Sequence, residues 1–281
     1  MIKTIKAGVI TDVVAKLCKE ANFQLGEDMV AALEKGQDEE ISLTGKNILK
    51  QLLENAEIAR DESVPICQDT GFAVVFVELG QDVRIEGGNL NEAIDEGVRK
   101  GYTEGYLRKS IVGNPINRVN TGDNTPSIIH TEIVPGDELK ITVAPKGGGG
   151  ENMSTLKMLK PAEGVEGVKN FVLETVRLAG PNPCPPIVLG VGIGGTFEKA
   201  AFLAKKALLR PAGSPNKMPE IAVLEKELLD DVNGIGIGPQ GFGGRVTALS
   251  VNIETFPTHI ACLPVAVNIN CHASRHKSCI L

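Results

Sequence analysis

The spacing of hydrophobic residues divides the chain into a helical beginning and a mixed remainder. Over residues 5–60 apolar side chains recur at helical intervals, as at Val13, Val14 and Leu17. From residue 72 the period changes, and 72–79 is a dense apolar run rich in β-branched and aromatic residues, which is typical of a buried strand. The pattern predicts an α/β fold, with a helical N-terminal region over about 5–60 and a mixed α/β body over about 61–276. We expect both in a single domain of residues 1–281.

Helices and strands alternate through the predicted body. The patterns predict helices over 91–105, 163–179, 196–208 and 219–233, and strands over 127–134, 138–145, 185–195, 246–254 and 259–271. Pro135, Gly136 and Asp137 separate the strands 127–134 and 138–145, so we expect a hairpin there.

Charge and hydropathy exclude two classes of partner. The chain has 281 residues and a formal net charge of −6, and none of its Lys/Arg runs exceeds two residues. Nucleic-acid binding normally requires a basic face, so we expect no nucleic-acid partner. No apolar stretch approaches the ~20 residues that span a bilayer. The N-terminal segment reads as an amphipathic helix rather than a signal peptide, which predicts a cytoplasmic protein.

Glycine-rich segments suggest two kinds of ligand site. Gly190, Gly192 and Gly195 have the spacing of a dinucleotide-binding turn between a strand and a helix. The acidic residue that should end a second strand about 20 residues later is missing, which leaves NAD binding as a distant alternative. The run KGGGG at 146–150 favours a nest of backbone N–H groups for a carboxylate, although glycines also serve close packing.

The six cysteines fall into two groups. Cys18 and Cys262 lie within apolar elements and suit buried thiols, and Cys279 lies near the C-terminus. The other three lie in polar or proline-marked turns beside predicted strands: Cys67, Cys184 and Cys271. No CxxC pair is present. Three thiolates on rigid loops suit an iron–sulfur cluster with one open iron, and zinc is the alternative metal.

Three motifs in order carry a family resemblance. They are CQDTG at 67–71, NPCPP at 182–186 and N-x-N-C-H-A-x-R at 268–275. Together with the glycine run they make the chain, from about residue 8 to 276, resemble the class I fumarate hydratases. This family of iron–sulfur hydro-lyases includes the L-tartrate dehydratases. Single-chain members continue into a second domain, so the resemblance implies the α subunit of a two-subunit enzyme, with a separate β subunit.

The resemblance also implies roles for individual residues. Cys67, Cys184 and Cys271 match the ligands of a [4Fe-4S] cluster. The matching catalytic positions are Asp69, a carboxylate for acid–base work, and His259. The matching substrate-binding positions are Gln68, Arg108, Gly148 and Gly149. Simpler structural roles remain open: Asp69 as a turn cap, His259 as a core histidine and Arg108 as a solvated cation. His272 is expected either to orient the Cys271 loop or to contact the substrate, and Arg275 to offset the charge of the thiolates.

The implied activity is the reversible hydration of fumarate to malate, with an open iron as Lewis acid and a small dicarboxylate as substrate. An L-tartrate dehydratase α subunit is the nearest alternative. An NAD-dependent oxidoreductase and a zinc-binding, non-catalytic subunit are more distant ones. We expect a dimer or heterotetramer that includes the β subunit.

Overall fold

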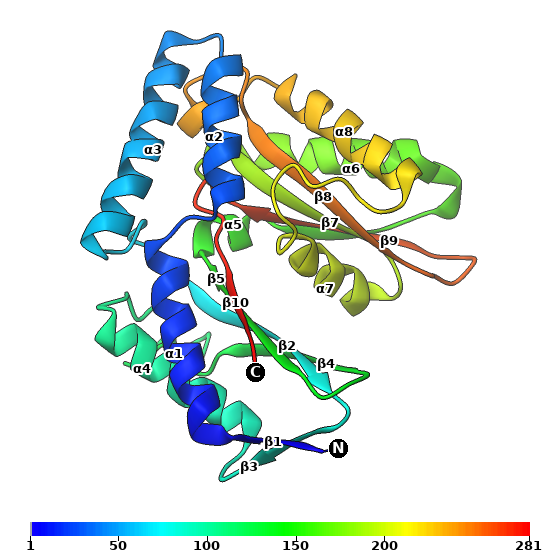
Figure 1. Ribbon diagram of the computed structural model, residues 1–281. Coiled ribbons are helices and arrows are strands. Elements are labelled where there is room, and N and C mark those ends of the chain that lie inside the picture. The colour runs from blue at the N-terminus through cyan, green and yellow to red at the C-terminus, as the bar shows by residue number, and fades with distance from the viewer. Residues whose placement is uncertain (1) are drawn as a thin grey trace. The chain divides into compact units, whose positions relative to one another are not determined.

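The computed structural model describes residues 2–281 and confirms the α/β fold with a helical N-terminal region (Figure 1). The chain folds into two compact units. The first unit comprises Met1–Leu25, Ala56–Gly148 and Arg275–Leu281, and the second comprises Gly26–Asn55 and Gly149–Ser274. The prediction of one domain over 1–281 stays a prediction. No helix among residues 2–281 is both long and apolar enough to cross a membrane.

The predicted helical region forms three helices: α1 (Ala7–Phe23), α2 (Glu27–Glu39) and α3 (Leu43–Glu62). In α1 the residues Ile10, Val14 and Leu17 lie three or four positions apart and are all buried. This spacing places them on one face of the helix, which packs into the core of the first unit.

The first unit is built on a four-stranded sheet. Its strands, in the order β10-β5-β2-β4, are β10 (Lys277–Ile280), β5 (Leu139–Lys146), β2 (Phe72–Gly80) and β4 (Ile128–Val134). Helix α1 packs on β5 and β10, and α4 (Leu90–Glu104) packs on α1 (Figure 1). A separate parallel pair joins β1 (Lys3–Lys6) to β3 (Val83–Glu86).

The predicted hairpin is wrong. Strands β4 and β5 do not pair with each other, because β2 lies between them. Strand β2 pairs with β4 in parallel and with β5 antiparallel. The apolar β2 gains a neighbour on each edge in this order, and its residues 73–77 are all buried. The turn at 135–137 therefore passes from one side of β2 to the other.

The second unit is a four-stranded sheet with helices on both faces. Its strands, in the order β6-β9-β7-β8, are β6 (Thr155–Leu159), β9 (Leu263–Asn270), β7 (Ile187–Gly194) and β8 (Ala248–Phe256). Helices α6 (Gly164–Ala179) and α8 (Pro219–Asn233) share the larger apolar core with the sheet. Helix α7 (Phe197–Ala207) packs on the other face, and the short α5 (Gly148–Asn152) precedes β6.

The glycines of the apparent dinucleotide motif allow a helix to pack closely on a strand. A Cβ atom at Gly190 would lie 2.0 Å from the carbonyl oxygen of Ala204, and one at Gly192 would lie 2.1 Å from that of Ala200. Both carbonyls belong to α7, so the glycines let this helix lie directly on β7. The glycine spacing is thus explained without a nucleotide.

Glu40 fixes the segment that leads into β8. Its buried carboxylate accepts hydrogen bonds from the backbone N–H groups of Ile41, Ser42, Arg245 and Val246, at 2.8 to 3.0 Å. Burial alone would raise the pKa of Glu40, but these four N–H donors outweigh it and hold the pKa below its usual value.

Candidate functional site

In the first unit, the turn at 67–71 brings together several predicted site residues. The Asp69 carboxylate accepts a hydrogen bond from Gly71 N at 3.0 Å through Oδ1 and one from Gly148 N at 2.8 Å through Oδ2. The Asp69 N–H points at the sulfur of Cys67 at 3.4 Å, and the Cys67 thiol lies 3.4 Å from Gln68 Oε1. A predicted cluster ligand, a predicted acid–base group and the start of the glycine loop are therefore neighbours.

Buried polar groups hydrogen-bond to the backbone carbonyls of this turn. The hydroxyl of Tyr102, a fully buried residue, donates to Thr70 O at 2.7 Å and lies 3.2 Å from Gly71 O. Burial raises the pKa of Tyr102, so its hydroxyl stays a proton donor. Asn124 Nδ2 also donates to Gly71 O, at 3.1 Å. These contacts fix the backbone that carries Asp69.

Arg275 supports the same turn, a role that the sequence did not reveal. Its guanidinium is buried, and Nη2 donates to Asp69 O at 2.7 Å. Its Nε donates to Asn22 Oδ1 at 3.3 Å. An arginine two residues before the C-terminal strand β10 thus hydrogen-bonds to the backbone of the predicted acid–base residue, and the motif spacing alone gave no sign of that contact.

Arg108 joins the first-unit site through its backbone. Its carbonyl oxygen accepts a hydrogen bond from Thr70 Oγ1 at 3.0 Å, one residue after Asp69. Its side chain is exposed. A cation fixed at its backbone and exposed at its tip suits a carboxylate ligand.

In the second unit, Cys184 and Cys271 lie on adjacent loops. His272 connects them, since its backbone N–H donates to Cys184 O at 3.4 Å and its Nδ1 lies 3.1 Å from the same oxygen. Cys184 is exposed and Cys271 is half-buried. Cys184 adopts a left-handed backbone with φ of 54°. The contact agrees with the prediction that His272 orients a cysteine loop.

The end of the glycine loop is also anchored in the second unit. Glu151, in α5, accepts hydrogen bonds from Lys205 Nζ at 2.7 and 2.8 Å, and from Asn268 Nδ2 at 3.2 Å. Gly149 itself is exposed, next to this anchored segment. The network ties α5 to α7 and β9, and the sequence patterns did not predict it.

His259 stands apart from the second-unit cysteine loops. It lies in an exposed turn, where its Nδ1 accepts a hydrogen bond from Ala261 N at 3.1 Å. The turn precedes β9, whereas Cys271 follows it, and eight residues of strand span about 26 Å. The alternative of a core histidine is wrong, because the side chain is exposed, and the catalytic role of His259 stays a prediction.

The donor atoms of the three predicted ligands suit an iron–sulfur cluster. None of the six cysteines forms a disulfide, and Cys67, Cys184 and Cys271 are exposed or half-buried on loops. Cys18 differs, since burial raises the pKa of its thiol to about 12. Cys67 belongs to the first unit and the other two ligands to the second. Within residues 2–281, no three His, Cys, Asp or Glu side chains are placed to hold a metal ion.

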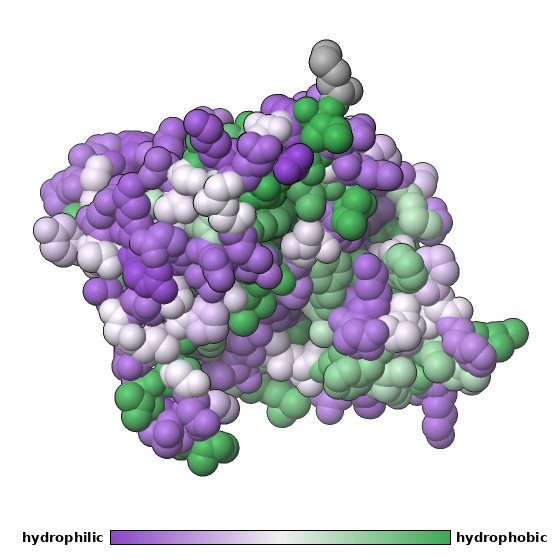
Figure 2. All heavy atoms as spheres, turned by 90° about the horizontal axis from the view of Figure 1, so that it is seen from below, coloured by the Kyte–Doolittle hydropathy of each residue, from purple (hydrophilic) through white to green (hydrophobic). Residues whose placement is uncertain are grey.

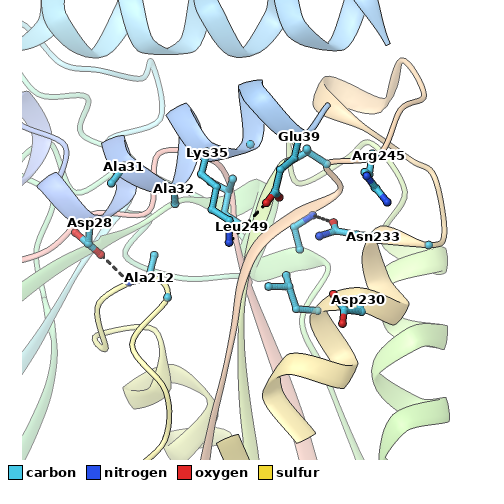
Figure 3. A pocket seen from close by; sticks show the side chains of 16 residues that line it. Asp28, Ala31, Ala32, Lys35, Glu39, Ala212, Asp230, Asn233, Arg245 and Leu249 are labelled. Carbon is cyan, nitrogen blue, oxygen red and sulfur yellow. Dashed lines mark hydrogen bonds and ion pairs between the residues drawn. The ribbon is translucent and has the colours of Figure 1, made fainter. Parts of the chain in front are cut away.

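A cavity of about 730 Å³ in the second unit contains none of the predicted site residues (Figure 3). It lies beside α2 and α8, and its charged lining groups mostly have partners within the protein. Asp28 Oδ2 accepts a hydrogen bond from Ala212 N at 2.8 Å, and Lys35 lies 3.8 Å from Glu39. Charges of both signs line it, so it indicates no particular class of ligand.

Comparison with known proteins identifies the family. The model of the fumarate hydratase (fumerase) family matches residues 11–280. A protein of Methanocaldococcus jannaschii named "Putative L(+)-tartrate dehydratase subunit alpha" is 49% identical over 272 residues, which cover 95% of each chain. The L(+)-tartrate dehydratase subunit alpha of Escherichia coli strain K12 is 36% identical over 276 residues, or 97% of this chain and 90% of the relative. The protein described here therefore belongs to the fumarate hydratase family.

Proposed function

We propose that the chain is the α subunit of an iron–sulfur hydro-lyase that reversibly hydrates fumarate to malate. Membership of the fumarate hydratase family supports the hydro-lyase class. The observation that carries the proposal is the Asp69 turn, in which the Asp69 carboxylate accepts a hydrogen bond from the glycine loop and the Asp69 backbone N–H points at the Cys67 sulfur. This turn combines a metal-binding sulfur, an acid–base group and amides suited to an anion.

Cys67, Cys184 and Cys271 would hold a [4Fe-4S] cluster. Three thiolates leave one iron without a protein sulfur, and the bound cluster supplies Lewis-acid chemistry at that iron. Their exposure on loops supports this assignment, whereas the buried Cys18 is unsuited to it.

The remaining groups of the site bind the substrate and move a proton. The guanidinium of Arg108 would bind one substrate carboxylate by charge-assisted hydrogen bonds, and the Gly149 amide would contact it as well. Gly148 would line the same site while its N–H donates to Asp69. Gln68, exposed beside Asp69, would add a polar contact. Each Asp69 oxygen accepts one backbone hydrogen bond and keeps a further lone pair, so the carboxylate can still exchange a proton with the substrate.

A second candidate is dehydration of L-tartrate at the same site. The names of the relatives from M. jannaschii and E. coli favour it. The reverse of fumarate hydration and the dehydration of L-tartrate both remove water from a hydroxy-dicarboxylate, so the same cation and amides would serve either substrate. Measuring kcat/KM for fumarate, malate and L-tartrate with one preparation distinguishes the two candidates.

We propose further that a separate β subunit completes the enzyme in a dimer or heterotetramer in the cytoplasm. The relatives are named as alpha subunits, which supports a β partner. Large apolar side chains are exposed in both units, among them Tyr106 at 92% and Ile260 at 91%. Figure 2 shows apolar groups between polar ones on one face of the molecule. Exposed apolar surface of this kind suits a subunit contact.

The test is anaerobic purification with and without a candidate β subunit, followed by iron analysis and hydration assays. We expect a brown protein with about four irons per chain and activity that depends on the β subunit. A protein that stays colourless and iron-free after anaerobic reconstitution would contradict the proposal, and one zinc per chain would favour the non-catalytic alternative.

A further inference from the structure

Gln240 makes an unusual double contact with the loop that carries Cys184. It lies in the short 3-10 turn η2 (Pro239–Gly241) of the second unit. Its backbone N–H donates to Pro185 O at 2.6 Å, and its side-chain Nε2 donates to the same oxygen at 2.8 Å. Gln240 thus supplies two hydrogen-bond donors to one carbonyl oxygen, that of Pro185, which follows the predicted cluster ligand Cys184.

The Gln240 side chain also reaches the second cysteine loop. Its Nε2 lies 3.2 Å from Nδ1 of His272, the residue that follows Cys271. The amide orientation follows from the Pro185 contact, since an amide oxygen in place of Nε2 would face another oxygen. The tautomer of His272 decides whether Nδ1 accepts from Gln240 or donates to Cys184 O. In both cases the His272 backbone N–H still points at Cys184 O.

The Cys184 loop depends on such outside donors. Pro183, Pro185 and Pro186 have no N–H, so the loop has few backbone donors of its own. Within the loop, Cys184 N donates to Pro181 O at 3.0 Å. The left-handed backbone of Cys184 is uncommon for a residue with a side chain, and it persists only where the surroundings hold it.

The segment that carries Gln240 is itself fixed. Gly243 N donates to Ile237 O at 2.8 Å, and Gly238 N donates to Thr247 Oγ1 at 3.1 Å. Glu40 holds the next residues through the N–H groups of Arg245 and Val246. Gln240 adopts φ of 52°, so its backbone N–H and its side chain both face the Pro185 carbonyl. A fixed segment can impose its geometry on the loop that it contacts.

We propose that Gln240 is a positioning residue for the cluster, acting through Pro185 O and His272 to hold the thiol of Cys184 in its ligand geometry. The inference rests on the proposed function, because it requires that Cys184 is a cluster ligand. Gln240 acts on the loop and has no assigned contact with substrate. Groups that orient metal ligands typically change metal affinity by about 10–100-fold when removed.

The test compares Gln240→Asn with wild type in the full chain. Asparagine keeps the amide and tolerates a left-handed backbone, but it is one methylene shorter, so its side chain cannot reach Pro185 O and His272. The backbone N–H to Pro185 O is kept, and the variant therefore tests the side-chain contacts alone. After anaerobic reconstitution, an iron chelator is added and the loss of visible absorbance is timed. We expect the cluster of Gln240→Asn to be lost about 10–100-fold faster than that of wild type, with an altered EPR spectrum of the reduced cluster.

Two controls separate positioning from folding. Gln81→Asn makes the same chemical change at an exposed turn of the first unit and should behave as wild type. In the cluster-free chain, alkylation followed by mass spectrometry should show a changed rate at Cys184 in Gln240→Asn and an unchanged rate at Cys262, with the thermal midpoint of unfolding retained.

Three results would overturn the proposal, and they have different meanings. Equal cluster retention in Gln240→Asn and wild type would show that Gln240 does not position the cluster, and it would leave the proposed function intact. Faster cluster loss together with a matching fall in thermal midpoint would reduce Gln240 to a general structural role. Wild-type protein that takes up no cluster would overturn the proposed function and this inference together.

Discussion

The carboxylate of Asp69 accepts a hydrogen bond from the backbone N–H of Gly148 at 2.8 Å. The two residues are 79 positions apart in the chain, and this contact joins the CQDTG turn to the glycine loop. The other Asp69 oxygen caps its own turn through Gly71 N. The structural and the catalytic interpretations of Asp69 therefore describe different oxygens of one carboxylate, and both can hold.

Replacing Asp69 by asparagine should lower kcat far more than it lowers stability. Asparagine keeps the turn contact with Gly71, but it cannot exchange a proton, and its amide group would face the N–H of Gly148. Loss of a positioned acid–base group costs about 10²–10⁴-fold in rate. The measurement is kcat for hydration with the cluster-loaded two-subunit enzyme. Asp137→Asn, in an exposed turn, is the control, and equal activities of the two variants would contradict the assignment.

Arg108→Ala should weaken the use of a dicarboxylate substrate. A hydrogen bond to a charged group contributes about 1.5–3 kcal/mol, which corresponds to a loss of about 10- to 150-fold in kcat/KM. Steady-state kinetics with fumarate and malate measures the loss, and its division between kcat and KM shows whether the contact strengthens in the transition state. Arg84→Ala removes another exposed arginine as the control. A change no larger than that of the control would exclude Arg108 from the site.

Cys184→Ser should abolish the visible absorbance of the reconstituted protein, whereas Cys18→Ser should retain it. Cys184 is exposed on a loop, while Cys18 is fully buried in α1 and burial raises its pKa to about 12. Absorbance and iron content after identical anaerobic treatment provide the comparison. Equal losses in the two variants would contradict the ligand assignment.

Glu40→Gln should destabilise the protein at neutral pH and much less in acid. The pKa of Glu40 is lowered in the folded state, so its ionised form adds stability above the unfolded pKa of about 4.3. That stability is lost as the pH falls through the folded pKa. At pH 7 the loss of hydrogen bonds to a charged group should cost about 1.5–3 kcal/mol.

Urea unfolding of wild type and Glu40→Gln at pH 7, and again in acid below the unfolded pKa of about 4.3, measures this difference. The difference in free energy of unfolding between wild type and Glu40→Gln should be smaller in acid than at pH 7. A gap that stays constant with pH would show that the charge of Glu40 contributes nothing.

Strong local patterns predicted most elements of the body. The prediction of 219–233 as a helix coincides with α8, and the prediction of 72–79 as a strand falls within β2. The sequence patterns did not predict the short strands β1, β3, β6 and β10, because a periodicity over four or five residues is too weak to detect. The pairing of β4 with β2 was not predicted either, since a turn sequence does not indicate that a third strand lies between the two strands that it connects.

The candidate site was predictable to the extent that its motifs are local. Cys67 and Asp69 stand in one short turn, so one motif identifies both. The supports of that turn are distant in sequence: Arg275 lies 206 positions from Asp69, and only the fold brings its guanidinium to the Asp69 carbonyl. Gln240 was not predicted for the same reason, since a glutamine between a proline and a glycine carries no chemical signature before its contact with Pro185 is known.

The close packing of α7 on Gly190 and Gly192 has an evolutionary consequence. Neither position accepts even a methyl group, because the carbonyl oxygens of the helix lie 2.0 and 2.1 Å from where it would be. Glycine should therefore persist at both positions as related sequences diverge, whatever substrate each lineage acquires. Invariance there would record the fit of one helix on one strand and should not be taken as the trace of an ancestral nucleotide site.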